Sequence, residues 1–311
     1  MINNKKIPII AVVGPTASGK TALGIELAKY TNGEVVSCDS MQIYKNLDIA
    51  TAKPTQSEMD GIPHHMIDVA EPCEVFSVQR FCAMAHEVIE DIYLRGKTPI
   101  LVGGTGLYID NTVMNTSFLA PARDERLTDE LLEFSKKNGN DALYEILLRE
   151  DFSAAQKIHP NDTKRVIRAI ETVRTTGKTR SDINKESREA QSKYDCLWLG
   201  INIERPDLYE RINMRVDKML KDGLLEETKK HVYPLKSTDS TSSSAIGYRE
   251  ALAYLDGLCT YGEMVNLLKR NTRRYAKRQQ TWFSANKNIN WLNFNLAFYE
   301  AKQLIEKRNL K

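Results

Sequence analysis

A glycine-rich loop close to the start of the chain most constrains how this protein can fold. Residues 14–21 read GPTASGKT and match the phosphate-loop pattern, GxxxxGK followed by Ser or Thr. The apolar run Ile7–Val13 before the loop is typical of a buried parallel strand, and helical spacing over Thr21–Tyr30 follows it. This order predicts a strand–loop–helix unit whose backbone amides hold a phosphate, with Lys20 as a point charge and Thr21 as a Mg²⁺ ligand. The predicted phosphate ligands are Gly14, Pro15, Thr16, Ala17, Ser18, Gly19, Lys20 and Thr21.

The loop leaves the identity of the phosphate compound open. Most proteins with such a loop bind ATP or GTP. Here an apolar strand ends in Gly103–Gly104, where a motor-type NTPase usually carries an Asp, and no guanine-reading NKxD motif is present. Kinases of small metabolites or nucleotides can lack both features, so a P-loop kinase stays an alternative.

Strands and helices alternate through the first third of the chain. Strands are predicted at Glu34–Ser37 and Pro99–Val102, with a helix over Phe76–Leu94 between them. This alternation predicts an α/β fold, a P-loop NTPase-like doubly wound parallel sheet.

The pattern then changes twice. Residues 121–177 offer only helical candidates, and a strand returns at Cys196–Ile203, followed by a helix that Asp207 would cap and that runs to about Leu220. We therefore expect residues 1–116 to form the first part of the core, residues 117–190 an inserted all-helical domain, and residues 191–311 the rest of the core with C-terminal helices. Glu263–Phe283 reads as one long basic helix.

Composition excludes several classes of protein. The 311 residues are 41% hydrophobic and 27% charged, and no apolar run approaches the ~18 residues of a membrane span. Five scattered cysteines form no CxxC pair, which disfavours a disulfide framework or a structural zinc site. His64 and His65 are adjacent and would point to opposite faces of a strand, so they would not share a metal ion. We expect a cytoplasmic monomer without membrane contact.

Positive charge is concentrated near the end of a chain whose net charge is only +3. Residues 264–299 contain no Asp or Glu but hold seven Lys or Arg residues. In the long helix, Arg270, Arg274 and Arg278 form one i,i+4 row, and Lys269, Arg273 and Lys277 form the next. A block of one sign predicts a polyanionic partner, with Arg274 and Arg278 among the residues that contact it. An amphipathic helix packed on the core is the alternative, and both can hold because they use different faces.

Seven motifs in order resemble bacterial tRNA dimethylallyltransferases, over roughly residues 8–285. They are GPTASGKT at 14–21, DSMQIY at 39–44, TAKP at 51–54, PHHMID at 63–68, GGTGLY at 103–108, AIGYRE at 245–250 and TRRYAKRQ at 272–279. The resemblance implies transfer of a dimethylallyl group from dimethylallyl diphosphate to the exocyclic amine of the adenosine 3′ of the anticodon, with diphosphate released and Mg²⁺ assisting. The sequence departs from the family pattern at Arg249, where Lys is common, and it is a residue short near Pro121.

The resemblance also implies roles for individual residues. Asp39 would be the general base, which agrees with its place just past a strand, although Asp39–Ser40 is also good turn chemistry. Lys20 and Thr105 complete the expected catalytic set, with Thr105 also contacting tRNA. The remaining tRNA contacts implied by the family are Asp39, Ser40, Met41, Gln42, Arg126, Lys164, Arg165, Val166, Ile167 and Arg168, where a solvated basic face is the alternative for the last five.

One further cation stands out from spacing alone. Arg211 and Arg215 are four residues apart and therefore share a helical face. Arg215 is either a diphosphate ligand or a surface partner of Glu210 or Asp217. A non-catalytic RNA-binding protein is a third functional class, disfavoured by the intact Lys20, Thr21 and Asp39.

Overall fold

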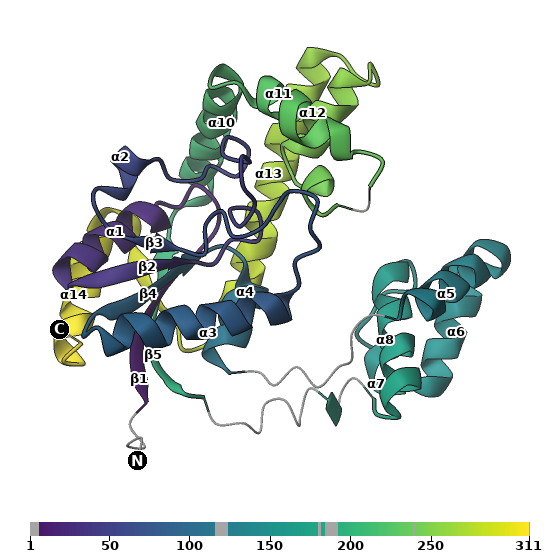
Figure 1. The fold of residues 1–311 in the computed structure, drawn as a ribbon, viewed down its shortest axis with the longest axis horizontal. Helices are drawn as coiled ribbons and strands as arrows, with labels where there is room; N and C mark the ends of the chain where they lie inside the picture. Colours follow the sequence, from purple (N-terminus) through teal and green to yellow (C-terminus); the bar gives the residue numbers. More distant parts are fainter. Residues whose placement is uncertain (1–5, 116–123, 180–181, 184–191, 239, 311) are drawn as a thin grey trace. The chain divides into compact units, whose positions relative to one another are not determined.

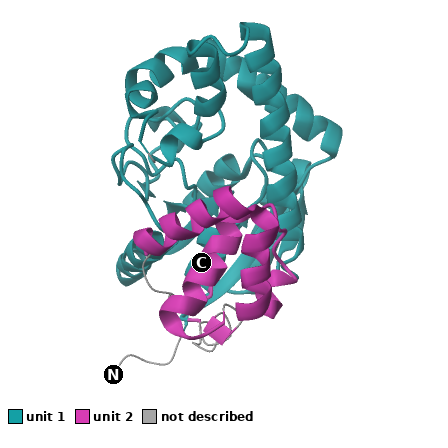
Figure 2. Ribbon diagram, turned by 90° about the vertical axis from the view of Figure 1, so that its right-hand side faces the viewer, with its two compact units in different colours: residues 1–113, 193–311 teal, residues 114–192 magenta. Residues whose placement is uncertain are grey.

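The computed structural model describes residues 6–115, 124–179, 182–183, 192–238 and 240–310. The chain divides into two compact units, Met1–Val113 with Lys193–Lys311, and Met114–Ser192 (Figure 2). It therefore divides after residues 113 and 192, where the sequence suggested 116 and 190. No helix within the described ranges is both long and apolar enough to cross a bilayer.

The first unit is built on a sheet of six strands in the order β3-β2-β4-β1-β5-β6. All neighbouring strands are parallel, which confirms the predicted α/β fold class. Strands and flanking helices follow the predicted alternation (Figure 1). The strands are β1 (Ile7–Val13), β2 (Gly33–Ser37), β3 (His64–His65), β4 (Thr98–Gly103), β5 (Tyr194–Asn202) and β6 (Asn290–Asn293).

Strand β1 is continuously apolar because helices cover both faces of the sheet. Ile10 and Val12 point into a core shared with Leu27 of α1 and Ala301 of α14. Helix α3 packs against β2 and β4 on the other face (Figure 1). The helices of this unit are α1 (Lys20–Tyr30), α2 (Gln56–Met59), α3 (Val78–Leu94), α4 (Gly106–Val113), α10 (Arg205–Lys221), α11 (Leu224–Glu227), α12 (Tyr248–Leu255), α13 (Tyr261–Ser284) and α14 (Ala297–Lys307).

The first residues of α13 and α10 show how capping residues and proline determine where a helix begins. Helix α13 begins with a reciprocal capping box between Thr260 and Glu263, two residues before the predicted start. Helix α10 corrects a prediction, because Glu204 and not Asp207 is its N-cap residue. Pro206 is favoured in a first helical turn, so the helix starts earlier and Asp207 lies inside it, where its charge meets the positive end of the helix dipole.

The second unit is entirely helical among its described residues. Its helices are α5 (Glu125–Asn138), α6 (Asn140–Glu150), α7 (Phe152–Ala155) and α8 (Thr163–Thr176). They enclose their own apolar core, which includes Leu131, Leu143 and Ile170. Glu171 is buried at 1% exposure and is compensated by Arg168 at 2.8 Å.

A buried carboxylate ties three segments together at the edge of the sheet where β2 begins. The Glu34 side chain is 2% exposed and accepts from Arg95 at 2.6 and 2.7 Å, from Lys97 at 2.7 Å, and pairs with His65 Nε2 at 2.8 Å. These bonds, chiefly those from Arg95, hold the pKa of Glu34 far below its ordinary value. The cluster therefore fastens β2 to β3 and to the turn between α3 and β4.

We predict that Glu34→Gln lowers the free energy of unfolding by about 3 kcal/mol at neutral pH, because it removes the charge that Arg95 and Lys97 are arranged around. Since the folded pKa is depressed, the carboxylate stabilises the fold above its ordinary pKa of about 4.5, and this contribution is lost as the pH falls below that value. The gap between variant and wild type should therefore narrow in acid. Urea unfolding across pH measures this.

The matched control is Glu90→Gln, which removes an exposed carboxylate 3.3 Å from Lys193. It should change stability by no more than about 0.5 kcal/mol. Equal effects of the two substitutions would mean that the Glu34 cluster does not fasten the sheet.

Candidate active site

The phosphate loop has the shape that its sequence predicts. Ala17 and Gly19 both have left-handed backbone conformations, with φ of 64° and 88°, so the chain curls between β1 and α1. No side chain caps the start of α1, and the first amides of the helix are free to meet an anion. Lys20 folds back across the loop, where its Nζ donates to Pro15 O at 3.1 Å. The Ser18 hydroxyl is buried without a partner among the described residues.

A pocket of about 340 Å³ opens beside this loop at the carboxyl edge of the sheet. It brings together many of the predicted site residues from four segments of the first unit. Those predicted residues are Thr16, Lys20, Thr21, Asp39, Ser40, Met41, Gln42, Arg215 and Arg278. Small apolar residues form another wall, namely Ala50, Ala52, Pro54, Ala245 and Gly247.

Two cations and one carboxylate meet in the pocket. The pKa of Lys20 is lowered to about 8, first by burial and then by the Arg215 cation, while Asp39 acts in the opposite direction. Burial also lowers the pKa of Arg215. Arg215 has no ion-pair partner in the described chain, and Asp217 instead pairs with Lys269 at 2.6 Å. The surface-pair alternative for Arg215 therefore fails, and its guanidinium is left for an anion.

Asp39 is a turn residue that also lines the pocket. Its Oδ1 accepts from Met41 N at 2.9 Å, so it shapes the turn that follows β2. It also lines the pocket opposite Lys20 and Arg215. Thr105 lies next to this turn, where its Oγ1 accepts from Ser40 N at 3.0 Å, but it does not line the pocket itself.

Gln279 is a structural residue that the sequence analysis missed. Its side chain is 5% exposed, its Oε1 accepts from Thr16 N at 2.8 Å, and its Nε2 donates to Gly104 O at 2.9 Å. One amide thus joins α13 to the phosphate loop and to the end of β4. The double glycine at residues 103–104 indicates that another part of the chain approaches closely, but it does not indicate which residue.

Arg211 supports the same loop from outside the pocket. Its Nε donates to Ala17 O at 2.8 Å, and its guanidinium lies over the Phe294 ring at 4.8 Å. Arg211 and Arg215 therefore share a helical face but differ in their contacts: Arg211 holds the phosphate loop, and Arg215 lines the pocket.

The predicted tRNA contacts on the second unit divide by exposure. Lys164 and Arg165 are exposed on α8, and Arg126 on α5 is exposed beside Glu130 at 3.1 Å. The prediction for Val166 and Ile167 needs correction, because both side chains are buried in the core of this unit and cannot reach a partner. Basic and apolar residues lie on different faces of α8. Val166 and Ile167 belong to its apolar face, which packs into the core of this unit.

The basic helix α13 also uses part of its charge internally. Lys269 pairs with Asp217, and Arg273 donates to Asn213 Oδ1 at 2.7 Å. Both bonds fasten α13 to α10. Two of the three cations in the row Lys269, Arg273 and Lys277 are therefore engaged within the protein. Arg270, Arg274, Lys277 and Arg278 remain exposed.

The donor set for a metal is sparse. In the described part of the chain, no three His, Cys, Asp or Glu side chains gather in a way that could hold an ion. His64 and His65 have separate partners, Ile62 O at 2.9 Å and Glu34 at 2.8 Å. All five cysteines are free thiols. Thr21, the residue predicted as a Mg²⁺ ligand, lines the pocket.

We predict that Gln279→Ala lowers the free energy of unfolding by about 1–3 kcal/mol, because it leaves a buried amide of the phosphate loop and a buried carbonyl without partners. Chemical denaturation measures the loss. Gln280→Ala, at the next and less buried position of the same helix, should have little effect. If both variants are equally stable, the amide does not hold the loop.

A phosphate loop, two unpaired cations and a carboxylate at the carboxyl edge of a parallel sheet define a P-loop protein that acts on a phosphorylated compound. The family follows from sequence models. The chain matches the model for IPP transferase over residues 42–286 and the model for isopentenyl transferase over residues 7–72. It belongs to the IPP transferase family.

Similar proteins span nearly the whole chain. The chain is 47% identical over 298 residues to the tRNA dimethylallyltransferase of Halalkalibacterium halodurans, covering 96% of this chain and 94% of the relative. It is 46% identical over 290 residues to the tRNA dimethylallyltransferase of Bacillus subtilis, covering 93% and 92%.

Two solved structures are also similar. One is the full-length tRNA isopentenylpyrophosphate transferase from Bacillus halodurans, with a TM-score of 0.71, 44% identity, and coverage of 98% of this chain and 99% of that one. The other is a eukaryotic dimethylallyltransferase acting on tRNA, with a TM-score of 0.82, 33% identity, and coverage of 97% and 79%.

Proposed function

We propose that this protein transfers a dimethylallyl group from dimethylallyl diphosphate to the exocyclic amine of the adenosine 3′ of the anticodon in tRNA. The observation that carries the proposal is the meeting of a phosphate loop and an acceptor carboxylate, Asp39, in one pocket. Membership of the IPP transferase family and relatives that are tRNA dimethylallyltransferases support prenyl transfer and not the kinase alternative.

The chemistry matches the residues around the pocket. An adenine amine is a weak nucleophile because its lone pair is delocalised into the ring, so it must lose a proton as the new bond forms. The bond forms between this nitrogen and the allylic carbon, the carbon–oxygen bond to diphosphate breaks, and the proton passes to the Asp39 carboxylate. Loop amides, Lys20 and Arg215 stabilise the negative charge on the departing diphosphate.

Mg²⁺ fits the donor set of this pocket. Mg²⁺ often takes most of its ligands from phosphate oxygens and water and few from protein. Thr21 would hold it, and the bound ion would offset charge on the leaving group.

The tRNA must present an unstacked base, because an adenine inside a stacked loop cannot reach a carboxylate in a pocket. The groups proposed to contact it lie on both units. They are Asp39, Ser40, Met41, Gln42, Thr105, Arg274 and Arg278 on the first unit, and Arg126, Lys164, Arg165 and Arg168 on the second.

The deciding experiment incubates the protein with tRNA, Mg²⁺ and either dimethylallyl diphosphate or ATP, and detects prenylated adenosine by mass spectrometry. We predict that Asp39→Asn lowers turnover by about 10²–10⁴-fold. Asparagine can still accept from Met41 N, so it keeps the turn and removes only the base. Unchanged thermal stability is the control, and the variant should still bind tRNA. Near-normal turnover of this variant would remove Asp39 from the mechanism, and ATP consumption without prenylation would favour a kinase.

A second prediction concerns the basic helix. Arg274→Ala should reduce the slope of log affinity for tRNA against log salt by about 0.7–0.9, the effect of one lost phosphate contact. Lys269→Ala on the same helix should leave the slope unchanged, because the Lys269 cation already pairs with Asp217. Titrations in increasing KCl measure both. Equal slopes for Arg274→Ala and wild type would contradict the proposed role of this face.

A further inference from the structure

One wall of the pocket has no regular secondary structure to hold it. Residues 47–54 lie outside every helix and strand, yet Ala50, Thr51, Ala52 and Pro54 line the pocket. A segment without helix or sheet bonds needs other partners for its backbone groups, and those partners then determine its shape.

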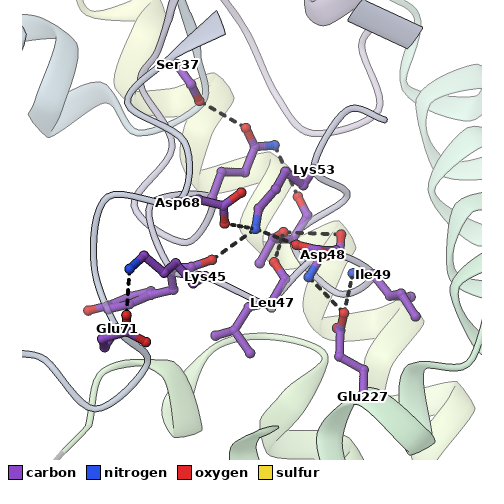
Figure 3. Close-up of polar contacts among 12 residues, drawn as sticks. Ser37, Lys45, Leu47, Asp48, Ile49, Lys53, Asp68, Glu71 and Glu227 are labelled. Carbon is purple, nitrogen blue, oxygen red and sulfur yellow. Dashed lines mark hydrogen bonds and ion pairs between the residues drawn. The ribbon is translucent and has the colours of Figure 1, made fainter. Parts of the chain in front are cut away.

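Glu227 at the end of α11 supplies those partners. Its Oε2 accepts from Asp48 N and Ile49 N, both at 2.8 Å, and its Oε1 accepts from Ala50 N at 3.3 Å. Figure 3 shows the carboxylate pointing at the amides of Asp48 and Ile49. The hydroxyl of Tyr248, whose side chain is fully buried, donates to Oε1 at 2.7 Å. A single carboxylate thus fixes three consecutive amides through charge-assisted bonds.

The other end of the segment is held by groups close to it in sequence. Lys53, with its side chain 6% exposed, bonds Asp48 and Asp68, each at 2.5 Å (Figure 3). Gln42 Nε2 donates to Thr51 O at 3.3 Å and Ala52 O at 3.2 Å. These contacts close the loop on itself. Glu227, 177–179 residues away, attaches it to the helices that follow β5.

The lining of the pocket combines groups that suit a phosphate with apolar surface. Lys20, Thr21 and Arg215 belong to the first kind. Ala50, Ala52 and Pro54 belong to the second kind, together with Met219, Ala245 and Ile246. A ligand whose diphosphate meets Lys20 and Arg215 would have these apolar residues available for its hydrocarbon.

Two parts of the apolar lining also fit closely together. A side chain on Gly247 would bring its Cβ to 2.8 Å from Ala50 Cβ. A small displacement of Ala50 therefore changes the space left for a ligand.

We propose that Glu227 is a positioning residue for the prenyl donor. By holding the amides of residues 48–50, it sets the wall against which the five-carbon hydrocarbon packs, without touching the ligand. The inference rests on the proposed function, and it assigns donor selectivity to a residue outside the pocket.

The experiment compares Glu227→Ala with Glu226→Ala, since Glu226 is the exposed neighbour and makes no ion pair in the described structure. Wild-type prenylation is measured first, so that a failure of the proposed function is seen separately. Glu227→Ala should raise the KM for dimethylallyl diphosphate about tenfold or more, as expected when a binding wall is misplaced. The KM for tRNA and inhibition by inorganic diphosphate should not change. Glu226→Ala should match wild type throughout.

Glu227→Gln tests the same proposal with a smaller change in structure. It also serves as the test if the alanine variant does not fold. Its amide oxygen can accept from Asp48 N and Ile49 N, but its NH₂ group cannot serve Ala50 N, so the donor KM should lie between the values for wild type and alanine. An unchanged donor KM in a folded variant would overturn the proposal. A rise in donor KM matched by equally weaker diphosphate inhibition would also overturn it, because the phosphate loop would then be the part affected.

Discussion

The site depends on the register of strand β1 with its two neighbours. Val13 is level with Gly103 of β4 on one side and with Gly200 of β5 on the other. In a parallel sheet this alignment brings the ends of three strands to one edge, where the phosphate loop begins. β2 pairs with β4 with Ser37 opposite Val102, which delivers Asp39 to the same edge. Gly103 at the end of β4 allows this close approach, because a Cβ there would lie 2.2 Å from Cys38 O.

Electrostatics at this edge favour an anion. Burial lowers the pKa of both Lys20 and Arg215, the Arg215 cation lowers the pKa of Lys20 further, and the single carboxylate of Asp39 acts in the opposite direction on both. A diphosphate would remove this repulsion, and the desolvated surroundings that lower both pKa values would strengthen its attraction. Arg211 and Lys269 do not line the pocket. Arg211 instead donates to Ala17 O, and Lys269 pairs with Asp217.

The sequence predicted the elements whose signals are local. The apolar run before GPTASGKT predicts β1, the loop and α1, and helical spacing predicts that residues 121–177, where α5, α6 and α8 lie, are helical. Residues with distant partners could not be predicted, because Gln279 bonds a loop 263 residues away and Glu227 bonds one 177–179 residues away. Spacing on a helix shows which cations share a face but not what that face meets, so it could not show that Lys269 and Arg273 bond to α10. Asp207 is a common capping residue, but Pro206 favours the first helical turn, so the helix begins at Arg205.

These distant contacts share a direction along the chain. Asp39, proposed to face the nucleophile, and Lys20, proposed to bind phosphate, precede the inserted helical unit. Arg211, Glu227 and Gln279, which hold the surrounding loops, follow it. β5, a direct neighbour of the central strand, also follows the insertion. The first 113 residues therefore carry Asp39 and Lys20 but lack Arg215 and the contacts from Arg211, Glu227 and Gln279, so the complete pocket forms only after the chain returns at residue 193. Contacts of such sequence separation cost loop-closure entropy before they stabilise anything, so ordering of the site should come late in folding.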